Sequence, residues 1–334
     1  MNSKRQPLDA QQLLVDLAKL GGSGLRVHEF DAGPAKPVEG PGVVRLGVHR
    51  TRALPHVSAD DFDILLTPQP APAPWVSVSA GRMDEVIMHL HGVVQTQPAA
   101  VAAAAQVLRM TLAIPFEDAQ CLESLAYSML LASRSFRAWR AATPIRTVAD
   151  EDSPRVLLSR ANGVLHIRLN RPNARNAVDA RMRDSLVEAL QFALDDPDRA
   201  PVLLTGAGPS FCSGGDLNEF GQADDPGVAH LIRVLRVPAR LVDRLRDRIR
   251  VHVHGACVGA GIEMPAAAGW ITATPDALFR LPEVAMGLIP GAGGTATIPR
   301  RIGRHRACYM ALTGYDIDAH TALSWGLIDA LEPA

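Results

Sequence analysis

The glycine-rich stretch Gly255–Glu263, with the sequence GACVGAGIE, limits most strongly what this chain can fold into. It lies between an apolar run typical of a strand, Ile249–Val253, and a run compatible with a helix, Ile262–Ala268. Glycine lets a backbone approach a ligand closely, and the first turn of a helix offers unpaired N–H groups to an anionic oxygen. The stretch ends in one carboxylate, Glu263, and a second, Glu283, follows in LPEVAMGLIPGAGGT. Two carboxylates beside a cradle of backbone N–H groups predict an acid–base site with an oxyanion hole.

Length and composition restrict the class of protein. The 334 residues are enough for one large domain or two ordinary ones, and 47% of them are hydrophobic. A net charge of −1 without a basic tail argues against a nucleic-acid partner. The 4 cysteines show no C-x-x-C spacing, so we expect no metal site, no disulfides and a cytoplasmic location. Neither a secretion signal nor a run of about 18 apolar residues occurs, so we expect a soluble protein without a membrane partner.

The first half of the chain divides into two parts of different character. Residues 1–82 give no indication of chemistry, and we treat them as an N-terminal extension of unknown role. They predict one helix and three short strands, at Asp9–Leu20, Val43–Val48, Asp63–Thr67 and Trp75–Val78. Residues 83–143 predict an all-helical module, because apolar residues recur at helical spacing and prolines stand where helices can begin. We expect its helices at Met83–Val94, Pro98–Leu112 and Pro115–Trp139.

Residues 144–334 alternate between strand and helix patterns, which predicts an α/β fold. The expected strands include Val164–Leu169, Val202–Thr205 and Arg250–His254, and the expected helices include Asp179–Leu194 and Val228–Ile249. The last of these would carry a row of arginines on one face. We interpret that row as a solvated or subunit-facing surface rather than an anion site, and it comprises Arg233, Arg236, Arg240, Arg244 and Arg248.

Four ordered motifs between about Gly163 and Asp329 resemble the crotonase (enoyl-CoA hydratase/isomerase) superfamily. Leu169–Val178 is similar to the loop that binds the adenine of CoA in that family. Phe211–Leu217 and GACVGAGIE are similar to its two oxyanion loops, and Leu281–Gly303 is its most recognisable segment. The resemblance implies a crotonase-like β-β-α spiral core for residues 144–334.

The order of the segments departs from that of the family. Family members continue with further helices after a segment like Trp325–Asp329, whereas this sequence stops at Ala334. Met83–Trp139 is similar to those helices, including a glutamate-containing helix that ends in Phe and Trp. We therefore hypothesise a circular permutation that places the helical module before the core. An unrelated helical domain is the alternative.

The resemblance also implies roles for particular residues. The backbone N–H groups of Gly215 and Ala260 would hold a thioester oxygen, while Glu263 and Glu283 occupy the positions of the hydratase carboxylates. Tight turns that only let helices pack are the alternative for the glycine loops, and compensation of a helix dipole is the alternative for Glu263. The resemblance further implies that CoA is bound by Arg171, Arg175, Asn176, Ala177, Ser213, Gly214, Asp216 and Leu217. For each arginine, a solvated charge is an equal alternative to a phosphate contact.

The implied function is an enoyl-CoA hydratase, a lyase of acyl-CoA or fatty acid metabolism that adds water across the 2,3 double bond. No metal or redox cofactor is implied, since CoA is part of the substrate, and family members are usually homotrimers or hexamers. An isomerase, a thioester hydrolase and an aryl-acetyl-CoA dioxygenase remain alternatives on the same fold. A non-catalytic CoA-binding subunit is an alternative of another class. The sequence does not specify the acyl group or the pathway.

Overall fold

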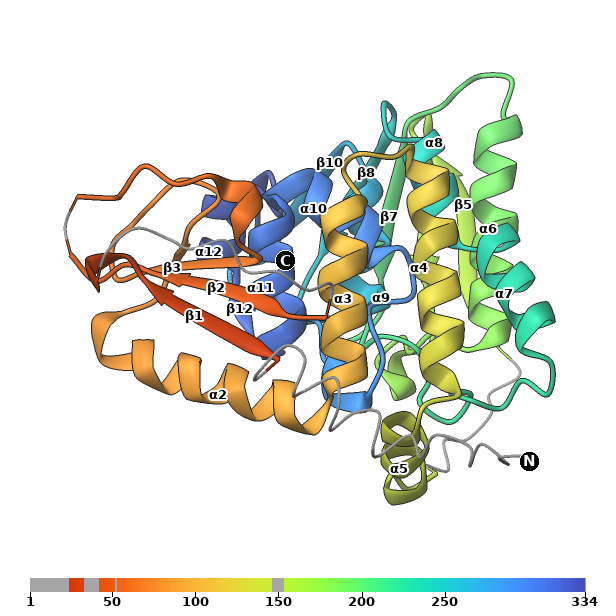
Figure 1. Cartoon of the computed structure of the whole chain (residues 1–334). Helices are drawn as coiled ribbons and strands as arrows, with labels where there is room; N and C mark the ends of the chain where they lie inside the picture. The colour runs from red at the N-terminus through yellow and green to blue at the C-terminus, as the bar shows by residue number, and fades with distance from the viewer. Residues whose placement is uncertain (1–23, 33–41, 52, 146–152, 334) are drawn as a thin grey trace, which may run out of the picture.

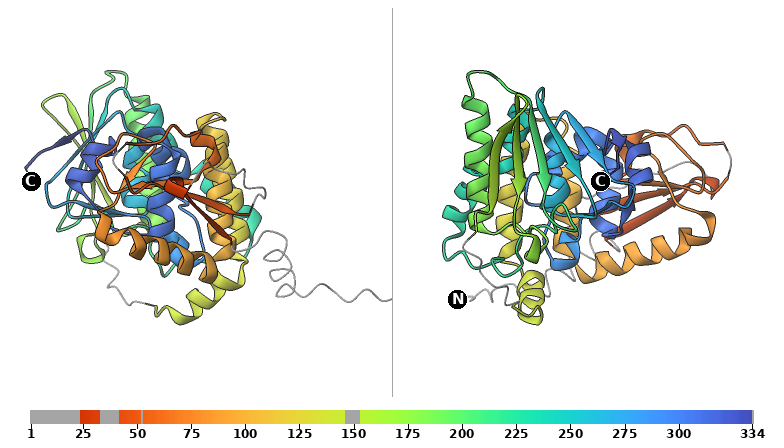
Figure 2. Two further views of the ribbon diagram at one scale, coloured as in Figure 1. Left: turned by 60° about the vertical axis from the view of Figure 1, so that its left-hand side comes forward. Right: turned by 180° about the vertical axis from the view of Figure 1, so that it is seen from behind.

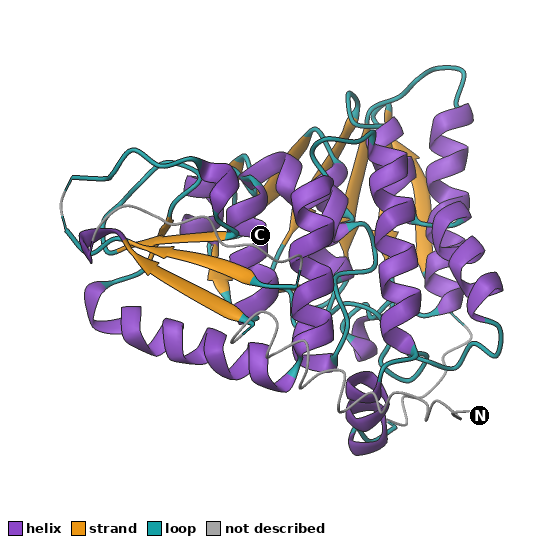
Figure 3. Cartoon of the chain, in the orientation of Figure 1, coloured by secondary structure: helices purple, strands orange, loops and turns teal. Residues whose placement is uncertain are grey.

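The structure is a computed structural model that describes residues 24–32, 42–51, 53–145 and 153–333. The helix expected at Asp9–Leu20 lies outside these residues. Within them, a 4-stranded, a 6-stranded and a 3-stranded sheet are packed among helices (Figure 1, Figure 3). One continuous cluster of buried apolar side chains runs from Leu25 to Ile328. The described parts of the extension, the helical module and the core therefore share one hydrophobic core.

The described part of the N-terminal extension is a parallel sheet. Its strands follow one another in space as they do in sequence: β1 (Leu25–Glu29), β2 (Val44–Val48), β3 (Ile64–Thr67) and β4 (Val76–Ser77). The three strands expected from the sequence are confirmed, and β1, whose sequence LRVHE is half polar, was not predicted. All four residues of β3 are buried.

A buried carboxylate ties this sheet to the helices. Asp63, directly before β3, is 1% exposed and accepts hydrogen bonds from Nε and Nη2 of Arg109 at 2.8 and 2.6 Å. It also accepts a bond from the backbone N–H of Arg45 at 2.8 Å. A buried carboxylate needs such partners to offset its desolvation. The sheet is thus docked on the helical module by a specific contact as well as by apolar packing.

The helical module consists of α2 (Met83–Thr96), α3 (Pro98–Met110), α4 (Phe116–Leu131) and α5 (Arg134–Ala142). The single helix expected at Pro115–Trp139 is wrong: α4 ends at Leu131, and a new helix begins where the Ser133 side chain accepts a hydrogen bond from the Phe136 N–H at 3.1 Å. A serine in this position caps a helix N-terminus. α3 and α4 pack side by side, and α4 also packs against two helices of the core, α7 (Pro226–Leu235) and α10 (Gly294–Ile302) (Figure 1).

The core is a 6-stranded sheet with a smaller 3-stranded sheet beside it. The larger sheet has the order β13-β10-β8-β7-β6-β5, parallel except for β5 against β6, and the smaller sheet has the order β12-β11-β9. β9 follows β8 and β11 follows β10, so the chain passes twice from the larger sheet to the smaller one. The view from behind in Figure 2 brings the strands of the larger sheet to the front of the molecule. The strands are β5 (Val156–Ala161), β6 (Val164–Leu169), β7 (Val202–Gly206), β8 (Ile249–Val253), β9 (Ala256–Val258), β10 (Trp270–Ala273), β11 (Leu278–Arg280), β12 (Ile317–Asp318) and β13 (Ala330–Leu331).

The helices of the core are α6 (Ala180–Asp195), α7 (Pro226–Leu235), α8 (Pro238–Arg244), α9 (Ala260–Glu263), α10 (Gly294–Ile302), α11 (Arg304–Thr313) and α12 (Ala319–Trp325). Among them, α6 packs against β5 and β6 of the larger sheet, whose central strands β7 and β8 bury alternate residues. Among the described helices, none combines the length and the apolar character that crossing a bilayer requires.

The long helix expected at Val228–Ile249 is also wrong. The chain forms α7 and α8 instead, because Pro238 opens α8 and the preceding residue, Val237, is extended at φ −83° and ψ 119°. A residue before proline is disfavoured in the helical region. The arginine row is therefore divided between two helices and the segment beyond them, and its members have different partners. Arg240 pairs with Glu117, for example, while Arg233 and Arg236 line a cavity.

Candidate active site

A cavity of about 360 Å³ lies where the core meets the helical module. All four residues to which the resemblance assigned catalytic roles line it: Gly215, Ala260, Glu263 and Glu283. The α4 helix contributes Tyr127, Ser128 and Leu131 to the wall, and α7 contributes Arg233. The structure thus brings together segments that are far apart in the sequence, and α4 of the helical module forms part of the cavity wall.

The Gly215 amide has no acceptor among the described residues. Val178 forms a parallel bridge with Gly215 in which the Val178 N–H donates to Gly214 O at 2.8 Å and the Asp216 N–H donates to Val178 O at 2.9 Å. This pattern uses the groups on either side of Gly215 and leaves its own N–H unpaired. A Cβ on Gly215 would lie 2.7 Å from the Phe220 ring, so the site admits only glycine without a shift of that ring.

The Ala260 N–H also lacks an acceptor among the described residues, in this case because of its position at the start of a helix. Ala260 is the first residue of α9, where an N–H has no partner within the helix. Gly259 precedes it at φ +50°, a conformation that favours glycine, and donates its own N–H to Arg280 O at 2.9 Å. The expected helix Ile262–Ala268 is only partly confirmed, because α9 ends at Glu263 and a 3₁₀ turn, Pro265–Ala267, follows. Within the described residues the Ala260 N–H has no acceptor.

Glu263 is buried at 2% exposure, and two backbone amides hold its carboxylate. Its Oε2 accepts from the N–H groups of Ala292 and Gly294 at 2.7 and 2.9 Å. Burial raises its pKa to about 7, although the two N–H donors act in the opposite direction. A Cβ on Gly294 would lie 2.6 Å from Glu263 Cγ, so the close approach of this amide requires glycine.

Glu283 is a buried carboxyl group with a different environment. It opens the 3₁₀ turn Glu283–Met286, and its Oε2 has no hydrogen-bond partner among the described residues. Burial raises its pKa well above the usual value, and the nearby Glu263 carboxylate raises it further. The Gly259 backbone passes so close that a Cβ there would lie 2.5 Å from Glu283 Oε1. The two carboxyl groups at this cavity therefore differ: Oε2 of Glu263 accepts two backbone hydrogen bonds, whereas Oε2 of Glu283 accepts none from the described residues.

A third buried carboxylate, Glu123 of α4, was not predicted as a site residue. Its Oε1 accepts from the Gly293 N–H at 2.7 Å, and its Oε2 accepts from the Thr295 N–H and hydroxyl, both at 2.7 Å. Burial, reinforced by Glu263, raises its pKa to about 8. Glu263 and Glu123 thus accept alternately from four successive residues at the start of α10.

A signal for Glu123 exists in the sequence. Gln120, Glu123 and Ser124 recur at helical spacing and are all buried, whereas the apolar Leu125 and Met129 on the same helix are 53% and 59% exposed. Polar residues that share a helix face with Tyr127 indicate a buried polar contact rather than a solvated surface.

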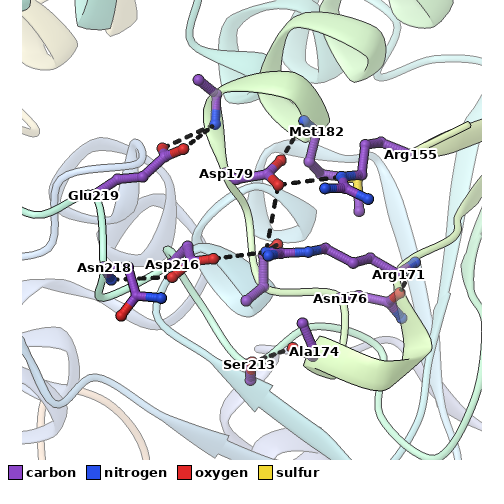
Figure 4. Close-up of polar contacts among 12 residues, drawn as sticks. Arg155, Arg171, Ala174, Asn176, Asp179, Met182, Ser213, Asp216, Asn218 and Glu219 are labelled. Atoms are coloured by element: carbon purple, nitrogen blue, oxygen red, sulfur yellow. Dashed lines mark hydrogen bonds and ion pairs between the residues drawn. The ribbon is translucent and has the colours of Figure 1, made fainter. Parts of the chain in front are cut away.

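The residues assigned to CoA lie in two loops that are held together by polar contacts (Figure 4). Arg171 donates from Nη1 to Asp216 Oδ2 at 2.7 Å and lies 3.5 Å from Asp179 Oδ2, which also pairs with Arg155 at 3.1 Å. Arg171 Nη1 donates to Ala177 O at 3.0 Å as well. Arg171 is therefore occupied within the protein.

The remaining residues of these loops differ in whether their side chains are bonded within the protein or exposed to a ligand. Asn176 is fully buried, and its Nδ2 donates to three carbonyls, those of Ala207, Ser210 and Phe211, at 2.8 to 3.0 Å. Its side chain holds the loop in shape. Arg175 is exposed. Other assigned residues serve the connection between loops: Ser213 Oγ donates to Ala174 O, Gly214 O accepts from Val178, and Leu217 O accepts from Arg140 of α5.

The fold and these motifs define a class of protein that comparison confirms. A model of the enoyl-CoA hydratase/isomerase family matches residues 159–334, more than half of the chain. The chain belongs to this family, and the crotonase fold expected from its motifs is confirmed.

Individual relatives show how far the similarity extends. The 2,3-dehydroadipyl-CoA hydratase of Escherichia coli (strain K12) is 34% identical over 54% of this chain and 69% of its own. The 1,2-epoxyphenylacetyl-CoA isomerase of the same organism is 37% identical over 50% of this chain and 65% of its own. The crystal structure of an enoyl-CoA hydratase from Mycobacterium smegmatis covers 54% of this chain and 71% of its own, with a TM-score of 0.51 at 30% identity. The chain spans 63% and 66% of the length of two further curated relatives.

Proposed function

We propose that this protein is a hydratase that adds water across the 2,3 double bond of an enoyl-CoA thioester. The observation that carries the proposal is the pair of buried carboxyl groups, Glu263 and Glu283, in one cavity with two amides that have no acceptor in the described part of the chain. Addition of water requires one group that accepts a proton and one that donates a proton. The similarity to the E. coli hydratase supports the same reaction class.

The different environments of the carboxyl groups assign the two roles. The two N–H donors on Glu263 favour its ionised form, whereas Glu283 receives none on Oε2 and is favoured in its protonated form. Glu263 then takes a proton from water as the water oxygen bonds to C3. The electrons of the double bond move onto the thioester oxygen, which forms an enolate. The enolate collapses as C2 takes a proton from Glu283.

The amides of Gly215 and Ala260 serve the enolate. Negative charge develops on the thioester oxygen, and two N–H groups that have no acceptor within the described residues can receive it without breaking an existing bond. Donors fixed before the reaction stabilise such charge without reorganisation, and the loss of one oxyanion donor costs about 10²–10³-fold in rate.

CoA would lie along the loops 171–178 and 213–217. The exposed Arg175 is suited to a phosphate group, while Arg171, Asn176 and Asp216 keep the two loops in register. The proposed chemistry uses only protein groups, water and the thioester itself, so CoA enters as part of the substrate.

An isomerase is the second candidate, because a relative at 37% identity is an isomerase. Moving a double bond requires only proton removal and return, for which one carboxylate suffices. Assay of the purified chain on a panel of 2-enoyl- and 3-enoyl-CoA thioesters distinguishes the two. Hydration consumes the 2-enoyl absorbance and yields a 3-hydroxyacyl-CoA. Conversion of 3-enoyl into 2-enoyl thioesters without hydration would replace the proposal with isomerisation.

The pH dependence of the reaction tests the assignment of roles. We expect kcat/KM to rise with pH as Glu263, with its pKa raised to about 7, becomes ionised. It should fall again at higher pH when Glu283, whose pKa is raised well above the usual value, loses its proton. The measurement is kcat/KM for hydration across the pH range. A profile without an acid limb would contradict the role of Glu263 as base.

The helical module would complete the site in permuted order. We propose that residues 83–143 take the place of the helices that follow the core in relatives, since α4 supplies Tyr127 and Leu131 to the cavity and Glu123 to the start of α10.

We also propose that the protein acts in the cytoplasm as a homotrimer or hexamer. α4 and α7, which pack together, expose several large apolar side chains: Leu125, Met129, Val228, Leu231 and Leu235. Molar mass in solution tests this assembly.

A further inference from the structure

Three arginines line the cavity, and one of them lacks an anionic partner. Arg183 and Arg236 both pair with Asp184, at 3.0 and 2.7 Å. Arg233, on α7, forms no ion pair with any carboxylate of the described residues, although it lies in the same wall. The first two thus share an anionic partner, whereas Arg233 has none among the described residues.

The guanidinium of Arg233 is held in one orientation by neutral groups of α4. Its Nε donates to Ser124 Oγ at 3.3 Å, and its Nη2 donates to Ser128 Oγ. Its Cζ lies 5.1 Å from the centre of the Tyr127 ring, in a cation–π contact. The two hydroxyls are themselves fixed, since Ser128 donates to Ser124 O at 2.7 Å and Ser124 is bonded to His230 Nδ1 at 2.9 Å. Nη1 has no acceptor among the described residues.

This arrangement satisfies two N–H groups but leaves the charge unbalanced. Burial lowers the pKa of Arg233, because the wall removes water from the guanidinium, while Tyr127 and Glu123 act in the opposite direction. A partly desolvated cation without a counterion is unfavourable, and an anion that binds beside it relieves that cost. Arginine presents a planar fork of donors that matches a carboxylate, and here the fork is already oriented.

The surroundings indicate where the anion would sit on a substrate. The Tyr127 ring contacts Arg233 on one side and packs on Gly291, next to the Ala292 amide that holds Glu263. Tyr127 therefore contacts both the cation and the segment that holds Glu263, and all three side chains line the same cavity. The cavity wall also contains Leu131, Val237 and Met264, which are suited to a methylene chain.

We propose that Arg233 binds a carboxylate at the end of the acyl chain, so that the preferred thioester is a dicarboxylic acyl-CoA rather than one that ends in a methyl group. This inference rests on the proposed function, because it assumes that an acyl-CoA occupies the cavity. It adds a specificity-determining residue at a position that the sequence assigned to a surface row.

The test compares binding of saturated thioesters, which requires no turnover. Glutaryl-, adipoyl-, pimeloyl- and suberoyl-CoA are titrated calorimetrically into the full chain beside the methyl-ended acyl-CoA of equal length. We expect at least one dicarboxylic thioester to bind about 10- to 100-fold more tightly than its partner, the range of one charge-assisted contact. Arg233→Gln should abolish this preference while it keeps the affinity for the methyl-ended thioester, which also shows that the variant is folded.

Two further variants sharpen the comparison. Arg233→Lys, which keeps the charge but not the fork, should retain only part of the preference. Arg236→Gln, which removes a paired arginine from the same wall, should leave the ratio of the two affinities unchanged. Equal affinities of the wild-type chain for both kinds of thioester, or a preference that survives Arg233→Gln, would overturn the inference alone. Failure to bind any acyl-CoA would instead overturn the proposed function on which it rests.

Discussion

Replacement of Glu263 by glutamine should lower kcat for the proposed hydration of enoyl-CoA by about 10³-fold or more, within the range expected when a general base is removed. The amide is close in shape to the carboxylate and can still accept from Ala292 and Gly294, so the cavity should keep its form. It cannot take a proton from water. We expect a loss of similar size for Glu283→Gln, which removes the proton donor to C2. Stopped-flow or steady-state assay of 2-enoyl-CoA hydration measures both.

A double variant and a matched control complete this test. Residues that act as one unit show losses that do not add, so Glu263→Gln combined with Glu283→Gln should be little slower than either single variant. Glu219→Gln is the control, since Glu219 lines the same cavity but its carboxylate accepts from the Ala180 N–H. It should cost far less. Turnover that survives in Glu263→Gln would indicate isomerisation by Glu283 alone, and equal losses in all three single variants would indicate a general structural effect.

Replacement of Glu123 by alanine is expected to lower both stability and turnover. The change leaves the buried N–H groups of Gly293 and Thr295 and the Thr295 hydroxyl without their acceptor. Each unsatisfied buried group costs about 1–3 kcal/mol, so a loss of roughly 3 kcal/mol or more in the free energy of unfolding follows. We expect turnover to fall as well. Gly293 and Thr295, which Glu123 binds, alternate with Ala292 and Gly294, so a shift of this segment would also displace the two amides that hold Glu263. Chemical denaturation and kcat for hydration are the measurements.

The pH dependence of stability tests whether the protonation state of Glu123, and not only its packing, affects the free energy of unfolding. The folded protein raises the pKa of Glu123 to about 8 from its usual value of 4.5, so the folded state binds the proton more tightly than the unfolded state. This contribution is fully present below the unfolded pKa and is lost as the pH rises through the folded pKa. We expect the free energy of unfolding to fall over that interval, and to fall less steeply in Glu123→Gln. Unchanged stability and turnover in Glu123→Ala would contradict a holding role for this residue.

Local pattern and motif order predicted much of the candidate site. Gly215, Ala260, Glu263 and Glu283, which the motifs singled out, line one cavity in the structure. The glycines are required where side chains or backbone pass within 3 Å of the position of a Cβ, as at Gly259 beside Glu283. Such contacts can be predicted from the sequence, because only glycine fits at these positions.

The contacts of α4 and α7 are harder to predict from the sequence. Glu123 binds residues 170 and 172 positions away, a separation at which periodicity carries no information about partners. The apolar Leu125 and Met129 of α4 are exposed, whereas Glu123 on the side of α4 that faces the core accepts hydrogen bonds from backbone amides. The helix break, by contrast, is visible in the sequence as Pro238. Because proline disfavours a helical conformation in the residue before it, Pro238 predicts that the arginine row is divided between two helices.

The most direct measurement is a crystal structure of the Glu263→Gln variant with a 2-enoyl-CoA bound. The distances that decide are those from the thioester carbonyl oxygen to the backbone nitrogens of Gly215 and Ala260. We expect both to be about 2.7–3.1 Å, with Glu283 beside C2 of the acyl group. A thioester oxygen that contacts neither amide, or an acyl group that lies outside the cavity, would contradict the proposed mechanism.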